Sequence, residues 1–424
     1  MSREYAKCSK SVTVFCLIAV LMFIILVVRV KFNGSISNST IRNEDQKHLQ
    51  LQGTSISNFS EQFLFSPELK LLIQESSQGK FYSEMTRDTP SLTTQLPGEG
   101  FSSDFPQNGC WWSKTKSDQT KLRCIPGLYV AGFPKCGTTD IFNKLAQHPS
   151  IRKPGNGGKE IYWWSPGRYS QDLNSYTDKV TPRDMNYTRE AYIMDGSPSL
   201  LNCILSKYPS RFPLSYLPPY TNADILKWVV PFSKIIATVR NPVDRSWSAY
   251  FYFHDNPPVT AESFEVDSMN MIQDMKQCLD KHSLRYCCAH WEEKTWHRRI
   301  LIHGSIYVCY LVDWKLKFGN NLYLVNLDEF RDNSLHIMKD IFRWLNVTAE
   351  LPGLEESLKV VYGATKFSRN EQMSIECRSR LEDFFRPYNV MLAEFFNDER
   401  FLKWNENSKH YPKTNLSDLE IQPN

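Results

Sequence analysis

The chain has 424 residues, of which 41% are hydrophobic and 13% aromatic, so it is long enough for one large globular domain or two ordinary ones. Its formal net charge of +4 equals the net charge of residues 1–31, which hold five Lys or Arg and one Glu. The rest of the chain is therefore about neutral, which excludes a global positive field for a polyanion and leaves only local basic patches.

The first predicted element is a membrane anchor at residues 11–30. Residues 12–28 are almost wholly apolar and have basic residues on both sides. The run suffices to span a thin bilayer, and no good cleavage site follows it. We expect an uncleaved signal anchor, a cytoplasmic tail at 1–10 and a luminal remainder, as in a single-pass type II membrane protein. A buried helix of the main domain is the alternative, and a luminal location excludes nucleic acid as a partner.

Two further features agree with a luminal location. Six Asn-x-Ser/Thr sequons are candidates for glycosylation: Asn33, Asn38, Asn58, Asn186, Asn346 and Asn415. Nine of the eleven cysteines follow the anchor, where an oxidising compartment favours disulfides.

Two cysteine pairs are disulfide candidates. Cys110 with Cys124 would close the entrance of the main domain, and Cys278 with Cys287 would close a short loop. The sequence does not pair the remaining cysteines beyond the anchor, which are Cys136, Cys203, Cys288, Cys309 and Cys377. Their odd number implies at least one free thiol.

Residues 31–105 are expected to form a stem between the membrane and the main domain. They lack sustained periodicity and are rich in Ser, Asn, Gln and Thr, which is typical of a partly disordered spacer. Only residues 63–74 have the pattern of a short helix. The ordered domain is expected at 106–410, with a tail at 411–424.

Strands and helices are predicted to alternate in this domain. Apolar, β-prone runs predict strands at 128–131, 191–195, 234–240 and 321–327, and helices are expected at 141–146, 242–253, 335–345 and 375–396. This order favours an α/β fold with a mainly parallel sheet. Ligands in such folds bind at the carboxyl ends of the strands.

The loop after the first of these strands is predicted to bind an anion. Gly132, Pro134 and Gly137 break the strand pattern, and Thr138 and Thr139 can cap the helix that follows. A strand, a glycine-containing loop and a helix start together direct backbone N–H groups and a helix dipole at one point. The loop differs from a nucleotide P-loop because its lysine stands inside the loop and not after the second glycine. A simple glycine turn is the alternative.

A second anion site is predicted at the end of another strand. Arg240 leaves the strand at 234–240, and Ser248 lies two turns along the following helix. Arginine offers a charged fork for phosphate, and serine adds a hydroxyl donor. The alternative is an ordinary strand-end arginine paired with Asp244.

These motifs carry a resemblance to a known family. Residues 132–139 resemble the 5′-phosphosulfate loop of Golgi carbohydrate sulfotransferases, and Arg240 with Ser248 resembles their 3′-phosphate motif. Residues 123–126, 134–140, 310–314 and 385–389 are similar to the branch that sulfates N-acetylgalactosamine 4-sulfate at O-6, and the likeness extends from about 122 to 404. The resemblance implies a P-loop-like sulfotransferase fold with a central, mainly parallel sheet flanked by helices.

The family's donor is 3′-phosphoadenylyl sulfate (PAPS), and the resemblance assigns residues to it. The donor-binding set comprises Lys135, Cys136, Gly137, Thr138, Thr139, Arg240, Ser248 and Tyr307. Lys135 would neutralise charge on the leaving oxygen, and Glu160 would take the proton from a sugar hydroxyl as general base. No metal is required, and no clustered ligand spacing suggests one.

The acceptor side is predicted from similar positions. Lys159, Trp163, Asp195 and Ser197 are the candidate acceptor-binding residues. Related enzymes read Lys-Glu-Pro-His where this chain has Ile161-Tyr162 after Lys159-Glu160, which bears on acceptor choice and turnover. The alternatives are a surface Glu160 paired with Lys159 and a Trp163 packed in the core.

The resemblance implies a Golgi membrane enzyme that sulfates a glycosaminoglycan. The expected acceptor position is O-6 of N-acetylgalactosamine 4-sulfate in chondroitin or dermatan sulfate. Heparan sulfate or another glycan is the alternative acceptor, and a non-catalytic glycan-binding relative or a luminal nucleotide kinase is the alternative function. The oligomeric state stays open, with a homodimer as one option.

Overall fold

The structure is a computed structural model that describes residues 65–77, 82–114, 118–164, 172–185, 189–201, 217–253, 259–289, 302–362 and 371–405. These residues belong to one compact unit that begins at Phe65. None of the helices in these ranges is long and apolar enough to cross a membrane. The predicted tail and anchor, residues 1–30, lie outside the described residues, as do Cys203 and all the candidate sequons except Asn346, which is exposed.

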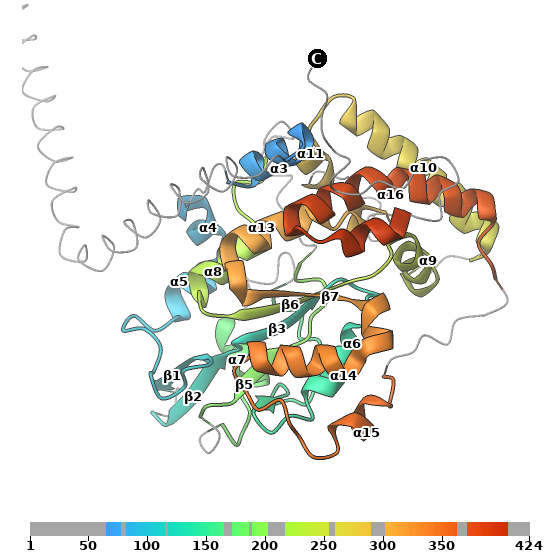
Figure 1. Ribbon diagram of the computed structural model, residues 1–424. Helices are drawn as coiled ribbons and strands as arrows, with labels where there is room; N and C mark the ends of the chain where they lie inside the picture. The colour runs from blue at the N-terminus through green and yellow to red at the C-terminus, as the bar shows by residue number, and fades with distance from the viewer. Residues whose placement is uncertain are drawn as a thin grey trace, which may run out of the picture. The chain divides into compact units, whose positions relative to one another are not determined.

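A five-stranded parallel sheet forms the centre of this unit, in the order β4-β5-β3-β6-β7 (Figure 1). The strands are β3 (Leu128–Gly132), β4 (Ile151–Arg152), β5 (Tyr192–Asp195), β6 (Lys234–Val239) and β7 (Leu322–Asn326). The four predicted strands and the α/β fold are thus confirmed. Two residues are too few to give β4 a sequence pattern. β3 and β5 are buried throughout, as expected of strands covered on both faces.

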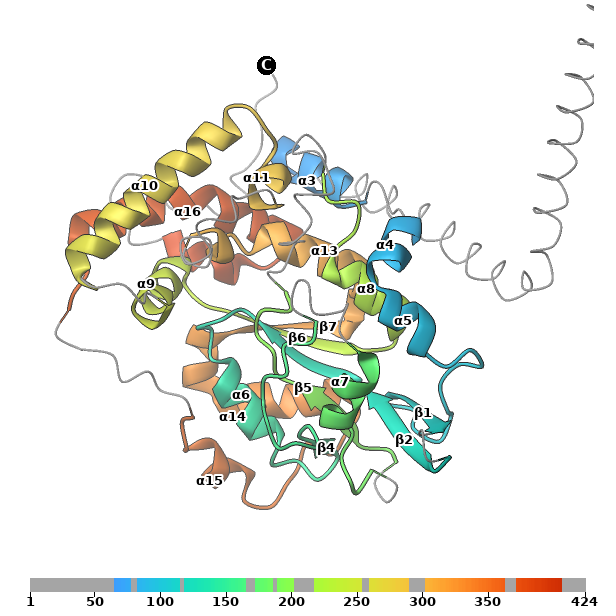
Figure 2. The same cartoon turned by 180° about the vertical axis from the view of Figure 1, so that it is seen from behind.

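Helices cover both faces of the sheet. α6 (Thr138–Leu145), α9 (Pro242–Phe253) and α14 (Leu327–Trp344) follow directly after β3, β6 and β7, so that they begin at the carboxyl edge. α6 and α14 lie on the opposite side of the sheet from α8 (Asn222–Val229) and α13 (Val308–Phe318) (Figures 1 and 2). Val130, Ile236 and Val325 form one apolar cluster with the side chains of α6 and α14.

Additional helices extend the layer that contains α13. They are α10 (Ala261–Leu279), α11 (Leu284–Ala289) and α16 (Ile375–Phe396), which is followed by the 3₁₀ segment η5 (Glu399–Asn405). Four short elements lie between these helices and strands in the chain: α7 (Leu173–Val180), α15 (Leu354–Leu358), η3 (His303–Ser305) and η4 (Gly319–Asn321). The limits predicted for α9 and α16 agree with the structure, whereas α14 begins eight residues earlier than its apolar pattern (335 − 327 = 8).

Part of the predicted stem is packed into the compact unit. α3 (Pro67–Ser77), α4 (Tyr82–Asp88) and α5 (Pro90–Gln95) all lie before residue 105. Leu69 and Leu72 of α3 are buried, and α3 contacts α13. The boundary expected at 105/106 therefore lies inside the unit that begins at Phe65.

Both predicted disulfides are present. Cys110–Cys124 joins the antiparallel strands β1 (Gly109–Lys114) and β2 (Thr120–Ile125), and Cys278–Cys287 joins the end of α10 to α11. The other cysteines that the structure describes, Cys136, Cys288, Cys309 and Cys377, are buried and belong to neither of these two bonds.

Candidate functional site

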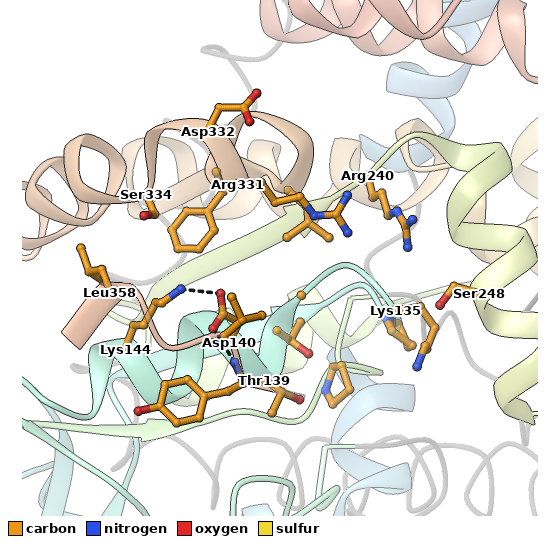
Figure 3. A pocket seen from close by; sticks show the side chains of 18 of the residues that line it. Lys135, Thr139, Asp140, Lys144, Arg240, Ser248, Arg331, Asp332, Ser334 and Leu358 are labelled. Atoms are coloured by element: carbon orange, nitrogen blue, oxygen red, sulfur yellow. Dashed lines mark hydrogen bonds and ion pairs between the residues drawn. The ribbon is translucent and has the colours of Figure 1, made fainter. Parts of the chain in front are cut away.

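A cleft with a volume of about 1530 Å³ opens at the carboxyl edge of the sheet. Lys135, Glu160, Arg240 and Ser248, which come from separate segments of the chain, all line it. Lys135, Arg240 and Ser248 lie toward one end, and Lys144, Ser334 and Leu358 lie toward the other (Figure 3). The structure therefore brings together the residues that the two anion motifs singled out.

The loop between β3 and α6 makes a tight turn that leads directly into the start of a helix. Lys135 and Gly137 both have positive φ, +70° and +79°, and a Cβ on Gly137 would lie 2.4 Å from Leu327 Cδ1. Gly137 is the N-cap of α6, so the prediction that Thr138 or Thr139 caps this helix is wrong; both are inside its first turn. The first N–H groups of a helix have no partner within it, and such a helix start binds anions.

Lys135 points into a cationic environment. Its Nζ lies 3.7 Å from the centre of the Tyr252 ring, over which it stacks. Burial and, next, the Arg240 charge lower the pKa of Lys135 from 10.5 to about 8. An anion placed beside this ammonium would reverse that effect, because an opposite charge favours the protonated form.

Arg240 faces the cleft without the partner that the alternative interpretation gave it. Asp244 pairs with Arg378 of α16 at 2.5 Å. Arg240 Nε is buried and has no hydrogen-bond partner among the residues that the structure describes. A buried donor without an acceptor is costly, so this guanidinium is suited to an anionic ligand.

Tyr307 is buried next to the anion loop and does not line the cleft. Its side chain is 1% exposed, its hydroxyl donates to Arg240 O at 2.8 Å and it lies 3.6 Å from Cys136 Sγ. The structure therefore corrects the prediction that Tyr307 contacts the donor: it holds the anion loop against the end of β6. Cys136 is also buried, and its amide donates to Phe133 O at 3.1 Å, so the prediction that Cys136 contacts the donor is corrected as well.

Arg245 is a supporting residue that sequence reasoning missed. It is fully buried in α9, its Nε donates to Pro134 O at 3.1 Å and its Nη1 donates to Ser305 Oγ at 2.8 Å. Arg245 thus fixes the loop from behind, and its charge also contributes to the lowered pKa of Lys135. The only signal was a second arginine in the segment after Arg240.

Glu160 lines the cleft with both carboxylate oxygens engaged. Lys159 Nζ lies 2.5 Å from Glu160 Oε1 and 3.3 Å from Thr138 Oγ1, so it connects the carboxylate to the anion loop. The Tyr162 hydroxyl donates to Glu160 Oε2. Pairing with Lys159, the alternative for Glu160, is therefore present, but Glu160 itself lines the cleft, whereas Lys159 is not among the lining residues.

Three of the four predicted acceptor residues are buried outside the cleft lining. Asp195, Ser197 and Trp163 are 1%, 3% and 4% exposed. Asp195 accepts from Ser197 Oγ at 2.6 Å and from the Tyr176 hydroxyl at 3.1 Å, and Trp163 stacks on the Tyr176 ring. The expected acceptor contacts are corrected accordingly, and core packing is the right interpretation of Trp163.

This buried network positions the segment that carries Glu160. Ser197 Oγ accepts a hydrogen bond from the Tyr162 amide at 2.9 Å, and Tyr162 has a φ of +57°. A left-handed conformation is costly for a residue with a side chain, so the hydrogen bond helps to hold it. Asp195 and Ser197 therefore act on Glu160 through Tyr162.

The far wall of the cleft carries charges that sequence reasoning did not single out. Arg331 of α14 and Lys359 after α15 are exposed and line the cleft. Lys144 is buried and pairs with Asp140 at 2.7 Å, and Asp140 also accepts from the Tyr362 amide at 2.9 Å. Each of these residues lies on an amphipathic helix or a loop end, where a charged residue carries no local signal.

The described residues contain no cluster of side chains that could bind a metal ion. Among the described residues, no three His, Cys, Asp or Glu side chains are placed to hold one ion.

Known proteins that match this chain are sulfotransferases. The model of the sulfotransferase family matches residues 126–301. Carbohydrate sulfotransferase 15 from Mus musculus is 25% identical over 322 residues, covering 68% of this chain and 56% of that protein. The Homo sapiens bifunctional heparan sulfate N-deacetylase/N-sulfotransferase 2 is 25% identical over 309 residues, covering 68% of this chain and 31% of that protein. The chain spans little more than half the length of the first of these relatives.

Two solved structures are also similar. A sulfotransferase from Alicyclobacillus acidocaldarius has a TM-score of 0.39 and 17% identity, covering 65% of this chain and 96% of that one. A mouse sulfotransferase complexed with PAP has a TM-score of 0.29 and 13% identity, covering 68% and 86%. Residues 126–301, which match the sulfotransferase family, contain the anion loop, Glu160, Arg240 and Ser248.

Proposed function

We propose that this protein transfers a sulfuryl group from PAPS to a sugar hydroxyl of a glycosaminoglycan. The observation that carries the proposal is that both predicted anion motifs, the loop at 135–139 and the pair Arg240 and Ser248, contribute residues to the lining of one cleft. PAPS has a 5′-phosphosulfate and a separate 3′-phosphate, so it requires two such sites. The matches to sulfotransferases support the same activity.

The residues fit this donor chemically. Arg240 Nε is buried without an acceptor among the described residues, and Lys135 has its pKa lowered to about 8 by burial and neighbouring positive charge. Both groups would gain from an anion. Ligand pockets commonly have volumes of about 300–1,000 Å³, so a cleft of about 1530 Å³ has room for a donor and part of an acceptor.

In the proposed reaction, the acceptor hydroxyl oxygen forms a bond to sulfur while the bond from sulfur to the bridging phosphate oxygen breaks. Glu160 takes the hydroxyl proton. Lys135 and the loop amides stabilise the negative charge that develops on the leaving phosphate oxygen. Lys159 and Tyr162 orient Glu160, and positioning supplies much of the rate enhancement, as in phosphoryl transfer.

The finer acceptor assignment is O-6 of N-acetylgalactosamine 4-sulfate in chondroitin or dermatan sulfate, and it rests on sequence resemblance. The exposed Arg331 and Lys359 on the far wall suit an acceptor that already carries sulfate. The similarity to a heparan sulfate N-sulfotransferase makes heparan sulfate the second acceptor to test. As part of the proposal, the protein is a type II membrane protein of the Golgi with this domain in the lumen.

One observation favours a second function, that of a glycan-binding protein without transferase activity. Both oxygens of Glu160 accept from a neighbour, Lys159 or Tyr162, so two of the about four acceptor positions of the carboxylate are already used and fewer remain for a sugar hydroxyl. The same PAPS assay separates the two functions.

The experiment is sulfate transfer from radiolabelled PAPS by the purified full chain to chondroitin 4-sulfate, dermatan sulfate and heparan sulfate. Glu160→Gln should lower the rate by about 10²–10⁴-fold and leave binding of adenosine 3′,5′-bisphosphate nearly unchanged. Lys135→Ala should lower both the transfer rate and the affinity for the bisphosphate. Glu350→Gln, an exposed carboxylate paired with Lys339 away from the cleft, is the matched control and should behave as wild type. No transfer to any acceptor, with tight binding of the bisphosphate, would favour the glycan-binding function.

A further inference from the structure

Two buried cysteines outside the candidate site lie unusually close together. Cys288 of α11 and Cys309 of α13 are both fully buried, and their sulfur atoms are 2.6 Å apart. Neither belongs to the disulfides Cys110–Cys124 or Cys278–Cys287. α11 and α13 also contact each other, so the pair lies at an existing helix interface.

This separation is too short for two thiols. Non-bonded heavy atoms pack at about 3.5–4.0 Å, and a sulfur–sulfur bond is about 2.05 Å long. A pair of sulfurs at 2.6 Å lies far inside the first distance. We propose that Cys288 and Cys309 form a third disulfide, which joins α11 to α13.

Other roles for this pair fit the structure less well. A metal site would need further ligands, and no group of three suitable side chains occurs in the described part of the chain. A reactive thiol is disfavoured because burial holds the pKa of Cys309 well above its usual value, and the neutral thiol is a poor nucleophile. A covalent bond accounts for the geometry without additional partners.

The bond requires an oxidant. Two thiols form one S–S bond and release two protons and two electrons. Oxidised glutathione or the disulfide of a protein oxidant takes up the electrons, and the secretory pathway supplies both. The inference rests on the proposed luminal location, which supplies the oxidant, and not on the proposed sulfotransferase activity.

The cross-link would stiffen the element that supports the anion loop. Cys309 is two residues after Tyr307, whose hydroxyl bonds to Arg240 O. Cys287, next to Cys288, is already bonded to Cys278. With the third disulfide, the tandem cysteines would join α11 to both α10 and α13, and thereby fix the first turn of α13.

The test is disulfide mapping of the full chain produced in the secretory pathway of cultured animal cells. The protein is unfolded without reductant, its free thiols are blocked with N-ethylmaleimide, and its peptides are identified by mass spectrometry. We expect Cys288 and Cys309 in one linked species and Cys377, a buried thiol, blocked. Because Cys287 and Cys288 share a peptide, a Cys278→Ser/Cys287→Ser variant isolates the new link. Blocked Cys288 and Cys309, or a link between Cys309 and Cys287, would overturn the proposal.

Thermal unfolding provides a second readout. Cys288→Ser, Cys309→Ser and the double variant should each lower Tm by a similar amount, about 3–5 °C for a closed loop of about 20 residues, because any one of them removes the same bond. Cys377→Ser is the control for loss of a buried thiol, and its effect should add to the others. Additive losses in Cys288→Ser and Cys309→Ser would show two independent thiols and contradict the proposal.

Discussion

Raising the pH from 7 to 9 should weaken binding of adenosine 3′,5′-bisphosphate because Lys135 loses its proton over this interval. The pKa of Lys135 is about 8, and the ligand phosphates are already ionised above pH 7, with a second pKa of about 6. If only the ammonium form binds, the apparent Kd is multiplied by one plus the ratio of neutral to protonated lysine. That factor is about 1.1 at pH 7 and about 11 at pH 9. The expected change is therefore about tenfold, or about 1.4 kcal/mol.

The assay is isothermal titration of the bisphosphate into the purified protein between pH 6.5 and 9.5 at constant ionic strength. Lys135→Arg keeps a charge throughout this range, so its Kd should be nearly independent of pH. Tyr252→Phe keeps the aromatic ring next to the ammonium and removes only the tyrosine hydroxyl. Its Kd should therefore depend on pH as in the wild-type protein. A flat wild-type profile, or the same slope in Lys135→Arg, would refute the reasoning.

The lowered pKa of Lys135 also predicts that the free energy of unfolding rises as the pH increases. The folded pKa of Lys135 is lower than the unfolded value of 10.5, so the unfolded chain binds more protons between about pH 8 and pH 10.5, and stability rises with pH in that window. Below pH 8 the partly buried ammonium of Lys135 lowers the free energy of unfolding. Lys135→Met should therefore raise Tm at pH 7, and its advantage should shrink as the pH approaches 10. An advantage independent of pH would indicate better packing and not a lost charge.

The remaining predictions concern the turn and the carboxylate. Gly137→Ala should destabilise the protein by about 2–4 kcal/mol, measured by denaturant unfolding, since it adds a clash with Leu327 Cδ1 at 2.4 Å to the cost of a positive φ. Gly157→Ala is its control: it also has a positive φ but no atom within 4 Å of the added Cβ, so it should cost only about 1–2 kcal/mol. Equal losses of stability in the two variants would show that the clash with Leu327 contributes nothing. Tyr162→Phe removes the hydroxyl that donates to Glu160 and should lower the sulfate-transfer rate about 3–30-fold, because Glu160 loses one of the two contacts that orient it; an unchanged rate would exclude this role.

The placement of Lys135 and Arg240 on one cleft could be predicted from sequence because its signals are local. A buried strand followed by Gly132, Lys135 and Gly137 specifies both a turn and a helix start within a few residues. Arg240 stands at the end of a nearly continuous apolar run, so its place at the carboxyl edge follows from the strand itself. β4 escaped prediction because two residues show no alternation.

The acceptor side could not be predicted because burial there depends on distant partners. Asp195 has the position of a solvent-facing strand-end carboxylate, yet the Tyr176 hydroxyl from α7 satisfies it inside the core. Arg331 enters the cleft wall only because α14 packs beside α6 on the same face of the sheet. The inclusion of α3 in the unit likewise depends on its contact with α13, more than two hundred residues along the chain (308 − 77 = 231). Such contacts are set by tertiary packing and have no local signature.

The claim that two anion sites bind one donor is tested most directly by comparing adenosine 3′,5′-bisphosphate with adenosine 5′-phosphate, which lacks the 3′-phosphate. Charge-assisted hydrogen bonds are worth about 1.5–3 kcal/mol, so the wild-type protein should bind the bisphosphate about 10–150-fold more tightly. Arg240→Met should abolish most of that preference and leave binding of the 5′-phosphate nearly unchanged. Equal affinities in the wild-type protein, or a preference that survives in Arg240→Met, would contradict the account.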